Sequence, residues 1–212
     1  MGRVLPILFN TDMVRAILGG KKTVTRRVIK KSQCTLLNKK ETSELEREGL
    51  YAPFDGMNDA ELIVSTYKPT YQKGDILYVR ETWCSGYDGE VYFYLADKNT
   101  EREQKQLKDY NVCRWRPSIH MPKQAARIWL KVTDVRVERL QDITEKQAIK
   151  EGAVEVKYDA NTGKEMSAAL DWFPVIWNST IKKSDVALYG WEANPWVWVI
   201  EFERCEKPES EG

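Results

Sequence analysis

The sequence predicts an α+β fold, in which a mixed, barrel-like β-sheet carries flanking helices and long insertions. Three observations predict it. Short segments alternate between apolar and polar residues, as strands with one buried face do. Two further segments place apolar residues at helical spacing between a capping residue and a stop signal. The longest strand candidate, residues 126–140, changes the parity of its apolar residues partway along, which is typical of a bent strand in a small barrel.

The N-terminal part of the chain predicts a strand, a helix and a second strand. Val4–Phe9 is short and apolar. Asn10 or Thr11 can cap the helix that follows, and Gly19-Gly20 ends it after about ten residues. The chain then enters an extended basic stretch that begins near Thr23.

The middle of the chain predicts three strands. Lys73-Gly74 forms a turn before the strand Asp75–Thr82, and Glu90–Ala96 alternates in the manner of a strand. Residues 126–140 follow, with a bulge or bend near Thr133-Asp134, where the parity of the apolar residues changes.

The C-terminal part predicts two helices and a closing strand. Asp142–Gly152 and Ser167–Asn178 have helical spacing, and Pro174 indicates a kink or a late start in the second helix. Trp196–Phe202 is apolar on both faces, so we expect it to be central or well covered. Because no linker divides the chain, we predict one domain over residues 1–212, with insertions near residues 32–72, 97–124 and 153–166.

Composition excludes some classes of protein. The 212 residues are 42% hydrophobic and carry a formal net charge of +1, so we expect neither disorder throughout nor a large polyanion-binding surface. No apolar run is long enough for a membrane span, and the N-terminus lacks the pattern of a secretory signal. We therefore expect a cytoplasmic protein with no membrane partner.

The small net charge hides two basic segments that contain no acidic residue. Lys21–Lys31 carries six cations and Arg114–Lys131 carries five. Either the two segments converge on one positive face that attracts a phosphate backbone or an anionic ligand, or they form separate solvated faces.

Metal and cofactor sites are not expected. The cysteines Cys34, Cys84, Cys113 and Cys205 lie 29 or more residues apart, and His120 is the single histidine. The usual spacings of zinc ligands are therefore missing. We interpret the cysteines as reduced, mostly buried thiols, and we expect neither a metal nor a cofactor.

The most informative segment is Gly20–Arg27, with the sequence GKKTVTRR. Alternate side chains of an extended stretch face the same way, so Thr23, Thr25 and Arg27 share one face, and Lys22 lies at the turn that leads into it. A hydroxyl, an amine and a guanidinium can therefore meet in one pocket. The segment lacks the glycine spacing of a Walker A loop. The alternative is a basic loop whose threonine satisfies the backbone.

This segment resembles a known signature. Gly20-x-Lys22-x-x-Thr25-x-Arg27 matches the GxKxx[ET]xR pattern of ASCH domains, which are small barrels related to the PUA fold. The resemblance implies a PUA-like mixed β-barrel with flanking helices and long insertions.

The resemblance extends beyond the motif to about half of the chain. It includes the turn and strand at Lys73–Leu77, the helix Ile143–Glu151 and the strand Val199–Phe202, in the order of the family. The longer ASCH proteins of phages and prophages also carry a segment similar to Trp115–Pro122. The chain looks most like this longer group.

At its motif the chain is similar to the bacterial N4-acetylcytidine amidohydrolases, in which a lysine, a threonine and a glutamate form the catalytic set. The resemblance places these roles on Lys22, Thr25 and Glu151. Lys22 would take the proton of Thr25, which would attack the acetyl carbonyl, and Glu151 would pass a proton to the cytosine amine or activate the deacylating water. Arg27 or backbone amides beside the turn would stabilise the oxyanion. The chain is about twice as long as those compact hydrolases, so its insertions can reshape the pocket.

Charged residues near the predicted pocket are further substrate-binding candidates. The motif itself supplies Lys21, Arg26 and Arg27. Glu81 ends a predicted strand; its alternative role is an ion pair with Arg80 or with a motif cation.

Aromatic and polar residues complete the substrate-binding candidates. Trp83 and Trp115 adjoin polar or cationic residues and either stack on a base or fill the core. Ser118 and His120 lie close together, but without a GxSxG elbow we favour a structural or ligand-contacting His120 over a catalytic one. Periodicity assigns four other tryptophans to the core: Trp172, Trp177, Trp196 and Trp198.

The leading hypothesis is therefore an ASCH protein that binds a modified cytidine nucleoside or single-stranded RNA and hydrolyses an N-acyl amide. A non-catalytic RNA-binding module is the first alternative. An ASCH-type ribonuclease, in which Lys22 and Arg27 stabilise phosphate charge, is the second. The oligomeric state is left open.

Overall fold

The computed structural model describes seven stretches of the chain: residues 2–29, 34–36, 65–67, 69–86, 89–97, 115–153 and 169–209. Its residues form two compact units, each built from separate stretches. The first unit comprises Met1–Lys22, Gly74–Val132 and Phe202–Gly212, and the second comprises Thr23–Lys73 and Thr133–Glu201. Two strands, β8 (Trp129–Arg139) and β9 (Trp196–Cys205), run through both units.

The strands of the first unit form a mixed sheet, which confirms the predicted α+β class. β1 (Val4–Leu8) pairs in parallel with β5 (Ile76–Arg80), and β5 pairs antiparallel with the beginning of β8. Alternate residues of β5 are buried, among them Leu77 and Val79, as expected for a strand with one face on the core. The predicted strand Asp75–Thr82 is therefore confirmed, two residues shorter at its end. The barrel character of the sheet stays a prediction.

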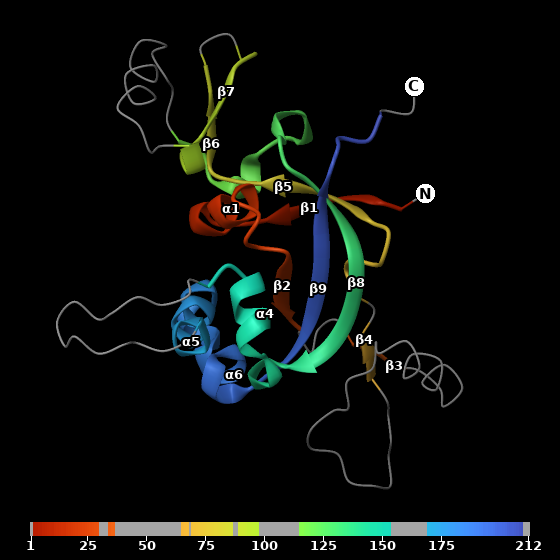
Figure 1. The fold of residues 1–212 in the computed structure, drawn as a ribbon, viewed down its shortest axis with the longest axis vertical. Coiled ribbons are helices and arrows are strands. Elements are labelled where there is room, and N and C mark those ends of the chain that lie inside the picture. Colours follow the sequence, from red (N-terminus) through yellow and green to blue (C-terminus); the bar gives the residue numbers. More distant parts are fainter. Residues whose placement is uncertain are drawn as a thin grey trace, which may run out of the picture. The chain divides into compact units, whose positions relative to one another are not determined.

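Helix α1 (Thr11–Leu18) forms where its caps predict it (Figure 1). The side chain of Asn10 accepts a hydrogen bond from the backbone N–H of Met13 at 2.9 Å. Val14 and Ile17 are the buried residues of the helix, and Gly19-Gly20 ends it. Gly20 has a φ of 70°, a left-handed conformation that favours glycine.

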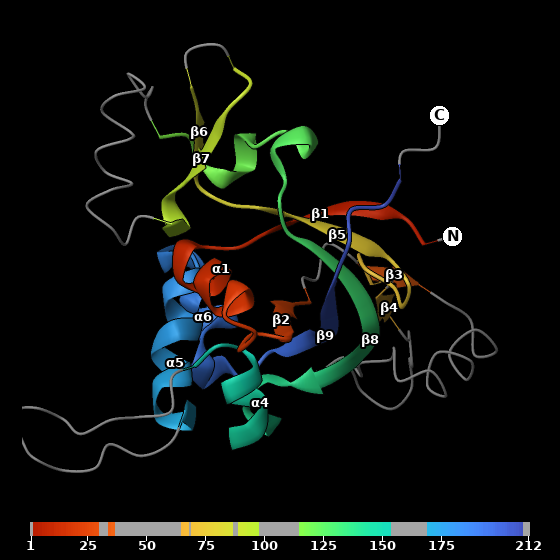
Figure 2. The ribbon, with the colours of Figure 1, turned by 45° about the horizontal axis from the view of Figure 1, so that its top comes forward.

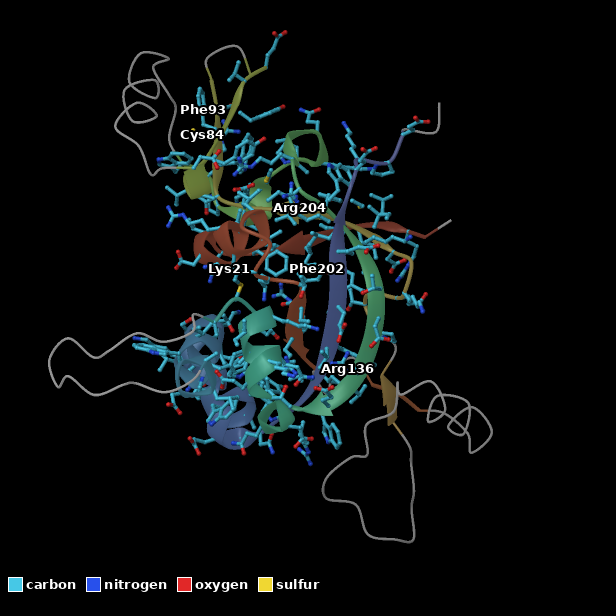
Figure 3. All side chains as sticks on the ribbon, in the orientation of Figure 1. Lys21, Cys84, Phe93, Arg136, Phe202 and Arg204 are labelled. Carbon is cyan, nitrogen blue, oxygen red and sulfur yellow. The ribbon has the colours of Figure 1, made fainter. Side chains whose placement is uncertain are left out.

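A hairpin and several 3₁₀ turns complete the first unit. In the hairpin, β6 (Trp83–Ser85) pairs antiparallel with β7 (Tyr92–Tyr94), so that Cys84 lies opposite Phe93 (Figure 3). The predicted strand Glu90–Ala96 is wrong in its last residues, because the chain turns into a 3₁₀ helix there and Leu95 donates its N–H to the carbonyl of Thr82. Two more 3₁₀ turns follow: η3 (Ser118–His120) lies in the predicted insertion 97–124, and η4 (Lys123–Ala125) lies at its end.

In the second unit the strand order is β8-β9-β2, and β2 (Val24–Val28) pairs antiparallel with β9. Four successive residues of β9, Val197 to Ile200, are buried, which confirms that this strand is covered on both faces. In β8 the buried parity changes between Val132 and Val135, as predicted, within one uninterrupted strand. A separate ribbon of β3 (Cys34–Leu36) and β4 (Ser65–Tyr67) lies in the predicted insertion 32–72.

Helices of the second unit gather on a shared core (Figure 2). Helix α4 (Glu145–Lys150) begins at a capping box between Thr144 and Gln147, which confirms the helix predicted there. Helix α5 (Ala169–Thr180) continues through Pro174, and its first described amides donate to the Glu145 carboxylate. The sequence did not predict α6 (Val186–Tyr189) or the 3₁₀ turns on either side of it, Lys183–Asp185 and Trp191–Ala193.

Among the described residues, no helix combines the length and the apolar character that a membrane span requires. Two of the four cysteines can be placed: Cys84 is buried and Cys205 is half-buried, and both are free thiols. The Cys113 prediction lies outside the described residues, as do those for residues 37–64, 98–114 and 154–168.

Candidate active site

The motif strand β2 is held at the end of helix α4 within the second unit. The backbone N–H of Thr23 donates to the carbonyl of Lys150 at 2.8 Å. Thr25 pairs with Ile200 of β9 and is only 3% exposed. The start of the motif strand and the residue preceding Glu151 are therefore adjacent, although they are far apart in the sequence.

Strand alternation separates the motif side chains as the sequence predicts. Val24 and Val28 pack against the helical core of the second unit, and Arg26 has the same parity. Thr25 and Arg27 have the opposite parity. The hydroxyl and the guanidinium assigned to the substrate pocket thus share one parity, and Arg26 belongs to the core side of the strand.

Arg26 is the most deeply buried charge of the motif in the second unit, with a fully buried side chain. Its Nη1 donates to Oε1 of Glu151 at 3.2 Å, and its Nη2 donates to Oε2 of Glu138 at 3.0 Å. Its Nε has no hydrogen-bond partner among the described residues. Burial this complete excludes water from Arg26, so its role is to hold the two carboxylates.

Glu138 extends the contact into a network of ion pairs. Its second oxygen accepts from Nε of Arg136 at 2.6 Å (Figure 3). Nη1 of Arg136 also donates to Glu201 at 2.6 Å and to Asp134 at 3.0 Å. The network therefore links β2, α4, β8 and β9 within the second unit. Among the described contacts of this network, two guanidinium groups bind four carboxylates.

Arg27 lies in a poorly solvated environment. Burial lowers the pKa of its guanidinium, and interactions with Tyr71 and Glu151 partly oppose this effect. Burial also raises the pKa of Tyr71, against the charge of Arg27. Arg27 is thus half-buried and electrostatically coupled to Glu151.

Lys21 and Lys22 belong to the first unit, where they follow the glycine turn after α1. Both backbone N–H groups donate to the carbonyl of Ala16, at 2.8 and 3.0 Å. Lys21 is exposed, whereas Lys22 is 2% exposed, with its Nζ 5.6 Å from the centre of the Phe9 ring. The turn therefore buries the motif lysine and leaves its neighbour in solvent.

Glu81 forms a separate buried cluster in the first unit. Its two oxygens accept from Nε and Nη2 of Arg127 at 2.9 and 3.1 Å, and Nη1 of Arg127 donates to Asp97 at 2.6 Å. The Arg127 guanidinium also covers the Tyr94 ring at 3.9 Å. Burial raises the pKa of Glu81, and the Arg127 contacts oppose that shift. Glu81 thus pairs with Arg127 and not with Arg80, whose Nε donates to the carbonyl of Met121. None of the described contacts of Glu81 is with a motif cation.

The remaining substrate-binding candidates differ in how deeply their side chains are buried. Trp83 is 4% exposed and packs in the core of the first unit, with the Arg116 guanidinium 5.2 Å from its ring centre. Trp115 and Ser118 are half-buried, and His120 is exposed. Burial of Trp83 favours the core interpretation of this indole over base stacking.

Two of the four tryptophans assigned to the core are buried there. Trp177 and Trp198 are buried, and Trp196 is half-buried beneath the Arg139 guanidinium, 4.3 Å from its ring centre. The core assignment of Trp172 is wrong, because this side chain on α5 is 42% exposed. Helical spacing predicts which face of the helix a residue lies on, but it does not predict whether another element covers that residue.

Each unit contains a cavity. The cavity of the first unit has a volume of about 910 Å³ and is lined mainly by apolar residues such as Val4, Ile76 and Trp129, with Lys123 and Lys207. The cavity of the second unit, about 270 Å³, lies along Arg26, Arg27 and Val28 of β2 and the segment 177–189. Neither lining includes Thr25 or Glu151. The smaller cavity nevertheless contacts both arginines that follow Thr25.

Sequence reasoning did not find Glu138, Arg136 or Arg127. A signal for the first two existed: Asp134, Arg136 and Glu138 alternate along a predicted strand, which places three charges on one face. Solvated strands also show such alternation, so the pattern does not distinguish a buried network. Among the described residues, no group of three or more histidines, cysteines or acidic residues is arranged to hold a metal ion.

Comparisons with known proteins give one structural similarity. No protein-family model matches the chain, and no curated protein matches it. Among solved structures, the chain is similar to the ASCH domain from Lactobacillus crispatus JV V101 at 12% sequence identity and a TM-score of 0.41. The match covers 95% of this chain and 79% of the other. At this level of similarity, neither fold nor activity transfers to this chain.

Proposed function

We propose that the chain is an ASCH-type protein that binds a modified cytidine nucleoside or RNA and hydrolyses the N-acyl amide of N4-acetylcytidine-like substrates. One observation carries the proposal. Arg26, the residue between Thr25 and Arg27 of the motif, binds Glu151 at 3.2 Å. The motif strand and the carboxylate assigned to catalysis by the resemblance thus belong to one hydrogen-bonded cluster in the second unit.

In the first chemical step, the hydroxyl oxygen of Thr25 attacks the acetyl carbonyl carbon, and Lys22 in its neutral form accepts the hydroxyl proton. A threonine hydroxyl is a weak nucleophile and needs such a base. Burial of Lys22 disfavours its charged form.

In the second step, the carbon–nitrogen bond of the amide breaks and cytidine leaves with a proton delivered through Glu151. Water then hydrolyses the acetyl-Thr25 ester, which releases acetate and restores the hydroxyl. Backbone amides beside the turn stabilise the oxyanion in both steps. Arg27 binds the substrate. The overall reaction consumes one water and forms cytidine and acetate.

Arg26 acts in this proposal as a positioning residue. Its fully buried guanidinium cannot reach a substrate in solvent, but it fixes one oxygen of Glu151 while Glu138 fixes the guanidinium. Charge-assisted hydrogen bonds of this kind are about twice as strong as neutral ones, so they restrict the carboxylate to one orientation.

The experiment is hydrolysis of N4-acetylcytidine, with cytidine and acetate measured by mass spectrometry. We expect turnover by the unmodified chain and a loss of about a hundredfold or more in kcat for Thr25→Ala, because the variant lacks the nucleophile. Thr23→Ala is the matched control: it removes the same hydroxyl two residues earlier and is expected to keep its activity. Circular dichroism verifies that both variants fold.

Three results would contradict the proposal. Undiminished hydrolysis by a folded Thr25→Ala variant would remove Thr25 from the mechanism. Salt-sensitive binding of single-stranded RNA without any release of acetate would identify a binding module instead. Cleavage of the RNA chain in the same reaction, detected as shorter products, would identify a ribonuclease.

A further inference from the structure

The larger cavity, of about 910 Å³, lies in the first unit on one face of the strands β1, β5 and the beginning of β8. The register pairs Val4 with Ile76 and Tyr78 with Trp129, and Ile76 and Tyr78 alternate along β5, so these four side chains share a face. Three of them, Val4, Ile76 and Trp129, line the cavity and form its floor. No residue of the motif Gly20–Arg27 lines it, and its volume is within the roughly 300–1,000 Å³ of small-molecule sites.

The floor is apolar and held in place. Trp129 is 4% exposed, and the centre of its ring lies 6.0 Å from that of Tyr78. Val4 and Ile76 are half-buried and pack against the same core cluster. Because paired strands fix the three side chains, the floor needs no rearrangement before a ligand binds. Side chains that lie together on one face of a sheet present a broad apolar surface, on which a planar ring can lie.

The charges in the lining favour an anion. Lys123 comes from η4 and Lys207 from the segment after β9, and both are exposed. Neither lysine forms an ion pair with another described residue. Among the described residues that line the cavity, Glu209 is the one carboxylate, so one positive charge remains in excess. Asp75, between two lining residues, does not reduce this excess, because its Oδ1 accepts from the backbone N–H and the Nε of Arg3 at 3.0 and 3.2 Å.

We propose that this cavity binds a small planar anion, in which an aromatic ring carries one carboxylate or a similar group. The ring lies on the floor, and the anionic group lies at Lys123 and Lys207. The side-chain amide of Gln124, which also lines the cavity, can donate to the same group. The proposal goes beyond the hydrolase, since none of the residues assigned to catalysis lines this cavity.

Calorimetric titration of the full chain at low salt tests the proposal with three probes. 2-Naphthoate has a planar ring and a charge, 2-naphthamide has the same ring without the charge, and octanoate has the charge on a flexible chain. We expect 2-naphthoate to bind about fivefold more tightly than 2-naphthamide, as an exposed ion pair predicts. Octanoate should bind more weakly than 2-naphthoate, because its chain loses conformational freedom on binding.

Substitutions that fill the cavity test its location. Ile76→Trp should weaken the binding of both naphthalene probes by about tenfold or more, because the new side chain covers the surface on which the ring lies. Leu8→Trp is the matched control, since Leu8 on β1 is exposed and does not line the cavity. Val4→Trp fills the floor from a different strand, so the test does not depend on the folding of one variant. Circular dichroism verifies that the variants fold.

Substitutions of the lysines test the charge. Lys123→Ala and Lys207→Ala should each reduce the preference for 2-naphthoate and leave the binding of 2-naphthamide unchanged. Lys131→Ala is the matched control. Lys131 pairs with Ile76 in the strand register and is exposed, but it does not line the cavity.

Four results would overturn the site. They are no binding of any probe, equal affinities for 2-naphthoate and 2-naphthamide, octanoate binding as tight as that of 2-naphthoate, and unchanged affinities in the folded filling variants. Equal losses in the lining lysine variants and in Lys131→Ala would show a diffuse surface charge effect and would also overturn it. The titrations measure no hydrolysis, so a failure of this site is distinguishable from a failure of the hydrolase.

Discussion

The two buried arginine clusters of the molecule, one in each unit, are satisfied in different ways. Arg127 in the first unit makes two contacts with Glu81 and one with Asp97, and its plane covers the Tyr94 ring. Arg26 in the second unit makes one contact to each of two carboxylates, and its Nε has no partner among the described residues. Arg127 is 26% exposed, whereas the side chain of Arg26 is fully buried.

This difference lies in the exposure of the two guanidinium groups and in the way each of them contacts its carboxylates. Around Arg127, Nε and Nη2 bind the two oxygens of Glu81, and Nη1 binds Asp97. Bidentate pairs of this kind are among the strong charge-assisted hydrogen bonds of proteins. Around Arg26, each of the two Nη atoms binds a different carboxylate, and one of these carboxylates, Glu151, follows helix α4.

The largest expected effect comes from breaking the Arg26 cluster. Arg26→Met leaves Glu138 and Glu151 without their buried cation, and removing one partner of a buried pair costs about 3–5 kcal/mol. Urea denaturation measures the free energy of unfolding. Arg204→Met is the control, because Arg204 on β9 is exposed (Figure 3). A loss no larger than that of Arg204→Met would show that Arg26 is not an essential partner of these carboxylates.

An intermediate and pH-dependent effect is expected from Arg127→Met. Glu81 is 1% exposed and would lose its charged partner, which costs about 1–3 kcal/mol near neutral pH because Arg127 is itself partly exposed. The pKa of Glu81 is already raised from 4.5 by burial, and Arg127 opposes this shift. The variant therefore raises the pKa of Glu81 further.

The sign of the pH dependence follows from proton binding. In the variant, the folded chain binds the Glu81 proton more tightly than the unfolded chain does. The contribution of Glu81 to stability is therefore greatest below pH 4.5 and falls as the pH rises through the folded pKa of Glu81. Urea denaturation over this range should show the difference from the unmodified chain shrinking towards acid pH. A difference that stays constant with pH would contradict the assignment to Glu81.

The smallest expected effect comes from the exposed end of the network. Asp134 is 51% exposed and contacts Arg136, which also binds two other carboxylates. Exposed ion pairs contribute about 0–1 kcal/mol, so Asp134→Asn should change the free energy of unfolding by less than about 1 kcal/mol. Hydrolysis of N4-acetylcytidine should be unaffected. A loss comparable with that of Arg26→Met would mean that the network acts as one cooperative cluster, and the distinction between its exposed and buried ends would fail.

Much of the fold could be predicted because the signals are local. Two helices begin within a residue or a few of where the sequence predicts them, with Asn10 and Thr144 as the caps, and the closing strand at Trp196 is buried on both faces. The predicted strand Glu90–Ala96 is too long at its end, because the backbone N–H of Leu95 donates to the carbonyl of Thr82, outside the strand, and this contact ends the strand. Helix α6 was not predicted because a helix this short contains no periodic apolar pattern.

The sequence by itself determined the longer strands, the capped helices and the local chemistry of the motif, in which Lys22, Thr25 and Arg27 follow a glycine turn. Only the tertiary structure decided which charges are paired. Arg26 is 112 residues from Glu138 and 125 from Glu151, and Arg127 is 46 residues from Glu81. The physical reason is that capping and alternation act over a few residues, whereas the partner of a buried charge depends on which elements pack against it.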